Sequence, residues 1–354
     1  MEIRRWSRAR LWITGAVTLL CMAAALLHTQ EAEQGITDGI RICAQTLIPS
    51  LFPFLFLSTF LVRSGACAAM GRPLSPVMRA LFGLPGNCAG AVLMSLLGGY
   101  PVGIGMAAEL RERGEITAEQ ARRMALFCVN AGPAFTISAV GAGMTGSTHA
   151  GVLLYASGAA ALLLMGIALR ILRHSGGGSA APEPTQAPPL LSDAMTGSVS
   201  SAVKSMVNIC AWVLLFSAVG HLLRLIPVPE TARLALTCIL EISSGCAAAA
   251  RQVPLWTLAA MLSFSGICVL CQLMPGCRRC GVSAGQLLLS RGISSALSGG
   301  ICALLCRLFP AYVQTSAGFQ PLYHAGLSVS VPACAALLIM GLIVINEVDI
   351  RHKT

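Results

Sequence analysis

Uncharged apolar stretches long enough to cross a bilayer recur along the chain, as in residues 11–27, 206–223 and 327–344. About 20 apolar residues cross the hydrocarbon core as a helix, and only helices or closed barrels satisfy their backbone there. The stretches show no two-residue alternation, which excludes a barrel. Only 11% of the residues are charged, whereas a soluble domain carries about a quarter. The sequence therefore predicts an all-α polytopic membrane protein.

The charges lie mainly between the apolar stretches. The chain has 24 Lys and Arg against 14 Asp and Glu, a formal net charge of +10. Short basic clusters at the ends of spans are typical of cytoplasmic loops. No basic stripe interleaves with aromatic residues, so we expect the lipid bilayer as a partner and no nucleic acid.

The N-terminus combines four arginines, between positions 4 and 10, with the first apolar stretch. Residues 28–30 (His-Thr-Gln) offer no clear small-residue cleavage site, so an uncleaved helix is favoured over a signal peptide. We expect residues 1–34 to hold a transmembrane helix whose N-terminus is cytoplasmic.

Cysteine and histidine give little support for a metal site or an enzyme. Most of the 15 cysteines lie in apolar stretches, where the thiol behaves as a small apolar side chain. Cys277 and Cys280 have CxxC spacing without a second such pair, which favours a loop with two thiols over zinc or redox chemistry. The six histidines show no ligand spacing, and no phosphate-binding or dinucleotide motif is present. We expect no metal, no cofactor and no enzymatic activity.

Several apolar stretches are interrupted by glycine and proline. Pro49 and Pro53 predict a bend near the start of the stretch 43–62. Residues 98–101 (Gly-Gly-Tyr-Pro) divide the stretch 88–110, which predicts either a re-entrant hairpin or a kinked span. A further interruption, Asn-Ala-Gly-Pro, follows at residues 130–133.

The only clear linker divides the chain into two halves. Residues 175–189 (SGGGSAAPEPTQAPP) are too rich in Gly, Ser and Pro to form a packed element. We expect a first repeat at 35–174, a linker at 175–191, a second repeat with a terminal helix at 192–346, and a polar tail at 347–354.

The two halves share an order of features. Phe-Leu-Ser at 56–58 corresponds to Leu-Phe-Ser at 215–217, and each half then has two interrupted segments, the second pair at 240–245 and 264–266. A broken helix frees backbone groups that hydrocarbon cannot satisfy, so such breaks persist where protein or a watery cavity covers them. Paired breaks in two halves are typical of a transporter's binding site.

Glu241 is the most informative single residue. A carboxylate in the middle of a span costs about 2.5–3.5 kcal/mol on insertion scales, so it faces a cavity or pairs with a cation. Helical spacing places Ser244 and Gly245 beside it, and Lys204 and Arg291 are the candidate charge partners. A structural ion pair between helices is the alternative. Lys204 and Arg291 could instead extend to the interface.

The predicted substrate site joins the interrupted segments of both halves. Asn130 is the polar counterpart of Glu241 in the first half. The alternative is that its amide only bonds backbone groups which the broken helix leaves free. The predicted substrate-binding residues are Gly99, Tyr100, Pro101, Gly103, Asn130, Gly132, Pro133, Glu241, Ser243, Ser244, Gly245, Ser265, Gly266 and Gln272.

The same segments carry a family resemblance. The chain resembles the sporulation integral membrane protein family called YlbJ or SpoVV, of the gate or nucleoside-recognition superfamily, over about residues 35–345. In the first half the resemblance rests on Leu47-Ile-Pro-Ser-Leu-Phe-Pro-Phe54, Gly99-Tyr-Pro-Val-Gly103, Glu109-Leu-Arg-Glu-Arg-Gly114 and Phe127-Cys-Val-Asn-Ala-Gly-Pro133. In the second half it rests on residues 192–223, Leu240-Glu-Ile-Ser-Ser-Gly245 and Phe264-Ser-Gly-Ile-Cys-Val-Leu-Cys-Gln272.

The resemblance implies two gate-type repeats and a transporter of a small organic anion. It further implies that the anion is dipicolinic acid, moved across the outer forespore membrane during sporulation. The alternatives are a non-transporting scaffold for spore-envelope assembly and a nucleoside-type transporter. The sequence does not decide the coupling ion, the direction of transport or whether the chain forms a homo-oligomer. The number of membrane crossings is also open, at roughly seven to ten.

Overall fold

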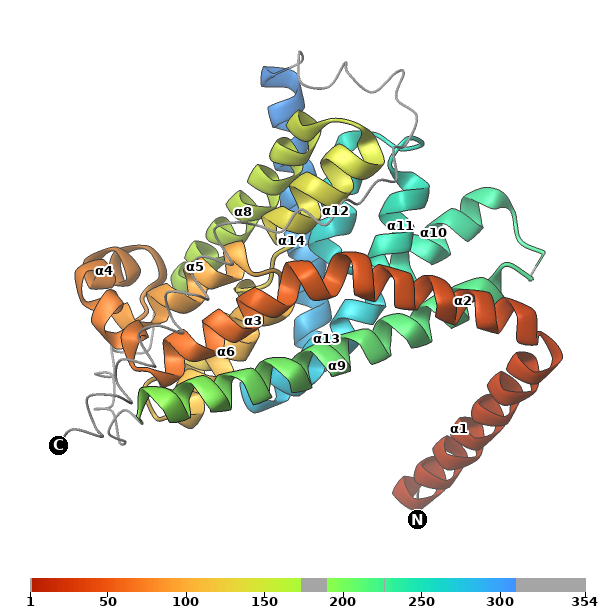
Figure 1. The fold of residues 1–354 in the computed structure, drawn as a ribbon, viewed down its shortest axis with the longest axis horizontal. Coiled ribbons are helices and arrows are strands. Elements are labelled where there is room, and N and C mark those ends of the chain that lie inside the picture. Colours follow the sequence, from red (N-terminus) through yellow and green to blue (C-terminus); the bar gives the residue numbers. More distant parts are fainter. Residues whose placement is uncertain (1, 173–189, 226, 310–354) are drawn as a thin grey trace.

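The computed structural model describes residues 2–172, 190–225 and 227–309, and every regular element in these ranges is a helix (Figure 1). The predicted all-α class is confirmed. The predicted linker 175–189, the apolar stretch 327–344 and the tail 347–354 lie outside the described residues.

The first half contains the helices before the linker. They are α1 (Glu2–Leu27), α2 (Thr29–Ile42), the π-helix η1 (Cys43–Leu47), α3 (Ile48–Arg63), α4 (Ala66–Phe82), η2 (Gly86–Cys88), α5 (Ala89–Leu97), α6 (Tyr100–Glu112), α7 (Ala118–Phe127), the π-helix η3 (Ala134–Thr145) and α8 (Thr148–Ile171). The second half follows with α9 (Leu191–Leu223), α10 (Glu230–Leu240), α11 (Ile242–Ala249), α12 (Leu255–Phe264), α13 (Gly266–Arg279) and α14 (Ala284–Leu308).

Four described helices are long and apolar enough to cross a membrane, and two bent helix pairs raise this number to six if each pair is one span. The four are Thr148–Ile171, Leu191–Leu223, Leu255–Arg279 and Ala284–Leu308. One bent pair, Thr29–Leu47 with Leu51–Arg63, turns by 55°. The bend falls between these two segments at Pro49, near the start of the stretch 43–62 as predicted, whereas Pro53 lies inside α3.

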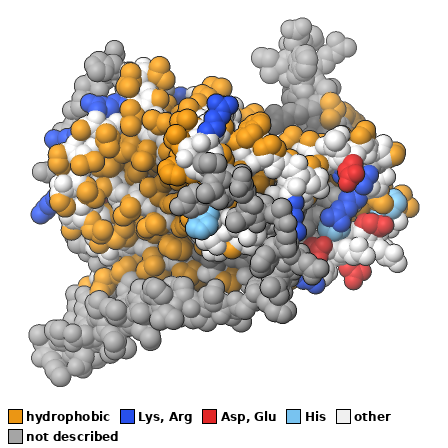
Figure 2. All heavy atoms as spheres, turned by 90° about the horizontal axis from the view of Figure 1, so that it is seen from above, with side chains coloured by type: hydrophobic (Ala, Val, Ile, Leu, Met, Phe, Trp, Pro, Cys, Tyr) orange, Lys and Arg blue, Asp and Glu red, His pale blue; other side chains and the backbone are white. Residues whose placement is uncertain are grey.

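The outer surface suits a bilayer. Figure 2 shows apolar side chains over much of the coloured surface, with acidic side chains at the right and Lys and Arg at both sides. Large apolar side chains such as Leu289, Val207 and Leu164 are exposed on α14, α9 and α8. An apolar exterior of this extent marks a surface that faces lipid or another apolar partner.

Helix α9 runs antiparallel to α2 and α3 along their length (Figure 1). A Cβ on Gly35 would lie 2.7 Å from the Cα of Ala218, and one on Gly39 would lie 3.2 Å from the Cα of Leu214. Glycines four residues apart let the two backbones approach closely, as in small-xxx-small packing of membrane helices. The N-terminal helices are thereby fixed to the second half.

The halves repeat the same order of elements. In each half a helix carrying the aromatic-Ser motif is followed by two broken segments and a final long helix. Corresponding helices pack on each other across the molecule, α3 on α9 and α8 on α14. Two pairs of helices at matching places in the two halves thus lie against each other.

Candidate functional site

The first break lies between α5 and α6. Gly99 has φ of 87°, a value that glycine adopts without steric cost, and Tyr100 and Pro101 then begin α6. The pieces have 9 and 13 residues, or about 14 and 20 Å, so neither alone crosses a core of about 30 Å. The predicted discontinuity is confirmed.

The second break of the first half packs directly against the first. Residues 128–132 form no helix between α7 and η3, and a Cβ on Gly132 would lie 3.1 Å from the backbone nitrogen of Gly99. A Cβ on Gly103 would overlap the carbonyl oxygen of Cys128. Glycine at these positions is therefore required by the contact between the two breaks.

Glu241 ends α10 and caps α11, so it does not lie within a helix. Its backbone is extended, with φ of −139° and ψ of 120°. Its carboxylate accepts hydrogen bonds from the backbone N–H of Ser243 at 2.9 Å and of Ser244 at 2.6 Å. Charge-assisted bonds of this kind stabilise a carboxylate at a helix N-terminus. Helical spacing from Glu241 thus does not apply, and the link to Ser244 runs through its amide.

The break between α12 and α13 packs against the break between α10 and α11. Ser265 and Gly266 both have φ of 74°, and Ser265 is the only non-glycine residue with positive φ among those the structure describes. A Cβ on Gly266 would lie 3.3 Å from the nitrogen of Ile242. Each half therefore brings its own two breaks together, and the discontinuity predicted at 264–266 is confirmed.

Tyr100 connects the breaks of the two halves. Its hydroxyl donates to the carbonyl oxygen of Leu262 at 2.7 Å, just before the break at Ser265. Tyr100 is buried and lies within electrostatic range of Glu241, Cys246 and Arg291. Tyr100 thus brings a break of the first half next to a break of the second.

Arg291 lies at the break between α7 and η3 and does not pair with Glu241. Its guanidinium donates to the carbonyl oxygens of Val129 at 2.8 Å and Leu126 at 3.0 Å. A cation near the last carbonyls of a helix is electrostatically favourable. This corrects one predicted charge partner, because the backbone amides already satisfy the Glu241 carboxylate.

Lys204 is the second corrected partner. It is exposed on α9, and the ion pairs among the described residues do not include Glu241 or Lys204. Its position agrees with the alternative that its side chain extends to the interface.

Three buried polar atoms at the α7–η3 break have no hydrogen-bond partner among the described residues: Asn130 Nδ2, Thr136 Oγ1 and Arg291 Nε. Asn130 is 4%, Thr136 1% and Arg291 1% exposed. An unpaired buried donor costs about 1–3 kcal/mol, and more when it is charged. The arrangement therefore provides donors for a ligand that supplies acceptor atoms.

Gln272 lies apart from this group. Its side-chain amide contacts the Cys268 sulfur at 3.3 Å, one turn earlier in α13, and no contact with a break is seen for it in the described part of the chain. Sequence reasoning missed a hydroxyl cluster beside the breaks, where Ser298 lies 3.5 Å from Ser157 and bonds the carbonyl of Ala259. Serines one turn apart in α14, at 294 and 298, were the available signal.

The CxxC pair shows no sign of a metal centre. Cys277 and Cys280 are free thiols and fully buried, and no metal-ligating group occurs among the residues that the structure describes. Burial raises the pKa of the Cys280 thiol, which lies between two spans, to about 11.

The helices and the paired breaks define a class, a polytopic helical membrane protein with broken segments. Residues 44–148, which include both breaks of the first half, match the model of the Gate family, described as nucleoside recognition. No solved structure matches the chain significantly.

The chain also matches a curated relative. The chain is 25% identical to the sporulation integral membrane protein YlbJ of Bacillus subtilis (strain 168) over 230 residues, which cover 60% of this chain and 56% of the relative. The chain thus spans little more than half the length of the curated relative it matches. The resemblance to this sporulation family is confirmed.

Proposed function

We propose that the chain is a transporter of a small organic anion, and that it is not an enzyme. The observation that carries this proposal is the group of unpartnered buried donors at Asn130, Thr136 and Arg291. Carboxylate oxygens are acceptors only, so an anionic solute complements this donor set. Half-helices that meet near the middle of a bundle are where transporters bind their solutes.

The local charge also favours an anion. The Arg291 guanidinium is bonded to carbonyls and a hydroxyl, and no carboxylate contacts it among the described residues. A buried cation without a counter-charge is costly. A bound carboxylate would supply that counter-charge and accept from the free Nε.

The proposed substrate is dipicolinic acid, a small aromatic molecule with two carboxylates. The printed name of the relative associates it with sporulation. We further propose the outer forespore membrane as its location, and the four arginines before the first apolar stretch support a cytoplasmic N-terminus.

The Glu241 carboxylate is negative and would repel a bound anion, and we propose that a proton neutralises it. No cation contacts its carboxylate among the described residues, and backbone amides alone bind it. An anion bound near the breaks would be repelled by this carboxylate unless the carboxylate were protonated. Glu241 is therefore the proposed coupling residue, taking up a proton as the anion binds.

Uptake of labelled dipicolinate into proteoliposomes tests the function. We expect saturable flux above empty vesicles, lost in Asn130→Leu and kept in Asn208→Leu, the same change at a half-buried position on α9. Absence of saturable flux in the wild-type protein would contradict a transporter of this substrate.

The Gate family is described as nucleoside recognition, so nucleosides are the specific second substrate class. Labelled uridine in the same vesicles separates the two classes. Flux of uridine without dipicolinate would replace the anion assignment, and flux of neither would favour a scaffold for spore-envelope assembly.

A further inference from the structure

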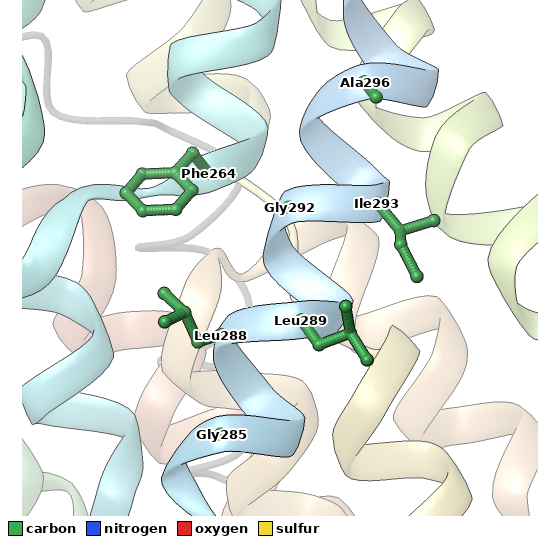
Figure 3. Close-up of a pocket in the computed structure, with 7 residues that line it drawn as sticks. All are labelled: Phe264, Gly285, Leu288, Leu289, Gly292, Ile293 and Ala296. Atoms are coloured by element: carbon green, nitrogen blue, oxygen red, sulfur yellow. The ribbon is translucent and has the colours of Figure 1, made fainter.

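An apolar groove lies on the outward face of α14, beside the α12–α13 break at Phe264 (Figure 3). It has a volume of about 680 Å³ and an almost wholly apolar lining. Leu288, Leu289 and Ile293 project from α14, and Phe264 of α12 forms one wall. None of the residues predicted to bind the substrate lines it.

Small residues leave this face of α14 open. Gly285, Gly292 and Gly300 would each place a Cβ with no atom within 4 Å, whereas a Cβ on Gly299 would meet the Ala260 Cβ at 3.2 Å. One face of the helix is thus packed on α12, while Gly292, Ala296 and Gly300 repeat a small-xxx-small spacing on a face without a partner in the described structure. This spacing is a packing surface for another membrane helix.

The chain itself supplies a candidate helix directly after α14. Residues 327–344 are 18 residues without a charge, or about 27 Å as a helix, and 18 residues separate them from Leu308, where α14 ends. A segment entering the bilayer from that end would run antiparallel to α14. A tether of this length keeps its effective concentration near the millimolar range, which favours it over a second copy.

The order of charges after the apolar stretch allows the same pairing. In an antiparallel arrangement the end of residues 327–344 would lie near the start of α14, where Arg278 is exposed at the end of α13. Glu347 and Asp349 are the first charged residues after the stretch, ahead of Arg351 and Lys353. We propose that residues 327–344 occupy the α14 groove as its antiparallel partner helix.

Photocrosslinking of the full chain in native membranes tests this pairing independently of any substrate. A genetically encoded benzophenone amino acid replaces Leu289 in one variant and Ala296 in another. The matched control places it at Val207 on α9, which is 63% exposed to the surroundings. Peptide mass spectrometry then maps the adducts.

The proposal expects adducts within one chain that map to residues 327–344 for both groove positions, and none there for position 207. Position 289 is nearer the start of α14, so its adducts fall later in 327–344 than those of position 296. Adducts at dimer mass, adducts only to lipid, or the reverse order would overturn it.

Discussion

The buried charged side chains of Glu241 and Arg291 find hydrogen-bond partners within the chain. The sequence identified Glu241 and Arg291 as polar residues in apolar stretches and gave Arg291, beside Lys204, as a candidate charge partner of Glu241. The backbone satisfies each of them instead, amides for Glu241 and carbonyls for Arg291. These partners could not be predicted, because the sequence indicated an interruption at 240–245 but not that Glu241 itself caps the next helix.

Replacing Glu241 with Gln tests its proposed proton role. Gln keeps one acceptor and removes the charge, so we expect slower transport that lacks any contribution of this carboxylate to the pH profile. Loss of the charged cap costs about 1 kcal/mol of stability. Flux against pH in proteoliposomes measures the first effect and thermal unfolding the second.

The matched control is Glu230→Gln, the same change at the exposed first turn of α10. A pH profile of Glu241→Gln that equals the wild-type profile would show that the carboxylate carries no proton in transport.

Cys280 offers a prediction about reactivity. Because burial raises its pKa to about 11, its thiolate at pH 8 is a few hundred-fold scarcer than that of an ordinary thiol. We expect maleimide labelling that is slow at pH 7–8 and accelerates as the pH approaches 11.

Labelling followed by peptide mass spectrometry measures this rate. An introduced thiol at the exposed position 283 (Ser283→Cys) should label quickly at pH 7–8. Equal rates at the two positions would contradict a buried, protonated Cys280.

The helices were predictable wherever glycine and proline mark their ends. The sequence placed the breaks at 98–101, 130–133 and 264–266, because these residues disfavour a continuous helix. It did not predict the π-helix at Ala134–Thr145 or the 89° bend between Ala69–Phe82 and Gly86–Leu97. Tertiary contacts decide these features, as in the close approach of Gly71 to Gly86.

The contact between the broken segments predicts that alanine substitutions at two glycines of α6 differ sharply in their effect on stability. Gly103→Ala places a methyl group in the carbonyl oxygen of Cys128, and overpacking of this kind costs about 1–3 kcal/mol. In Gly105→Ala the new Cβ meets no atom within 4 Å, so stability is unchanged or slightly raised.

Thermal unfolding of the purified protein in detergent compares the two variants. If both alanines lowered the midpoint equally, the loss would reflect the helix itself and not the contact at the break.

At the scale of the whole molecule, side chains of one half bond the backbone of the other. Arg291 of α14 bonds the end of α7, and Tyr100 of α6 bonds α12. The order of helices in each half could be read from the sequence. The contacts between the halves could not, since they depend on how distant segments pack.

Arg291→Gln should therefore loosen the junction of the halves. It removes the charged bonds to two carbonyl oxygens, each worth about 1.5–3 kcal/mol, and we expect a lower unfolding midpoint and weaker anion transport. Arg307→Gln, in the exposed last turn of the same helix, should change neither. An unchanged midpoint in Arg291→Gln would exclude a structural role for these bonds.

The course of α9 along α2 and α3 has a consequence for biogenesis. The ribosome completes the first half while Gly35 and Gly39 still lack the helix that covers them, because α9 is synthesised about 150 residues later. The first half is therefore synthesised before α9 can pack on Gly35 and Gly39. Two separately expressed fragments, divided within residues 175–189, should accordingly be unstable alone and recover when they are produced together.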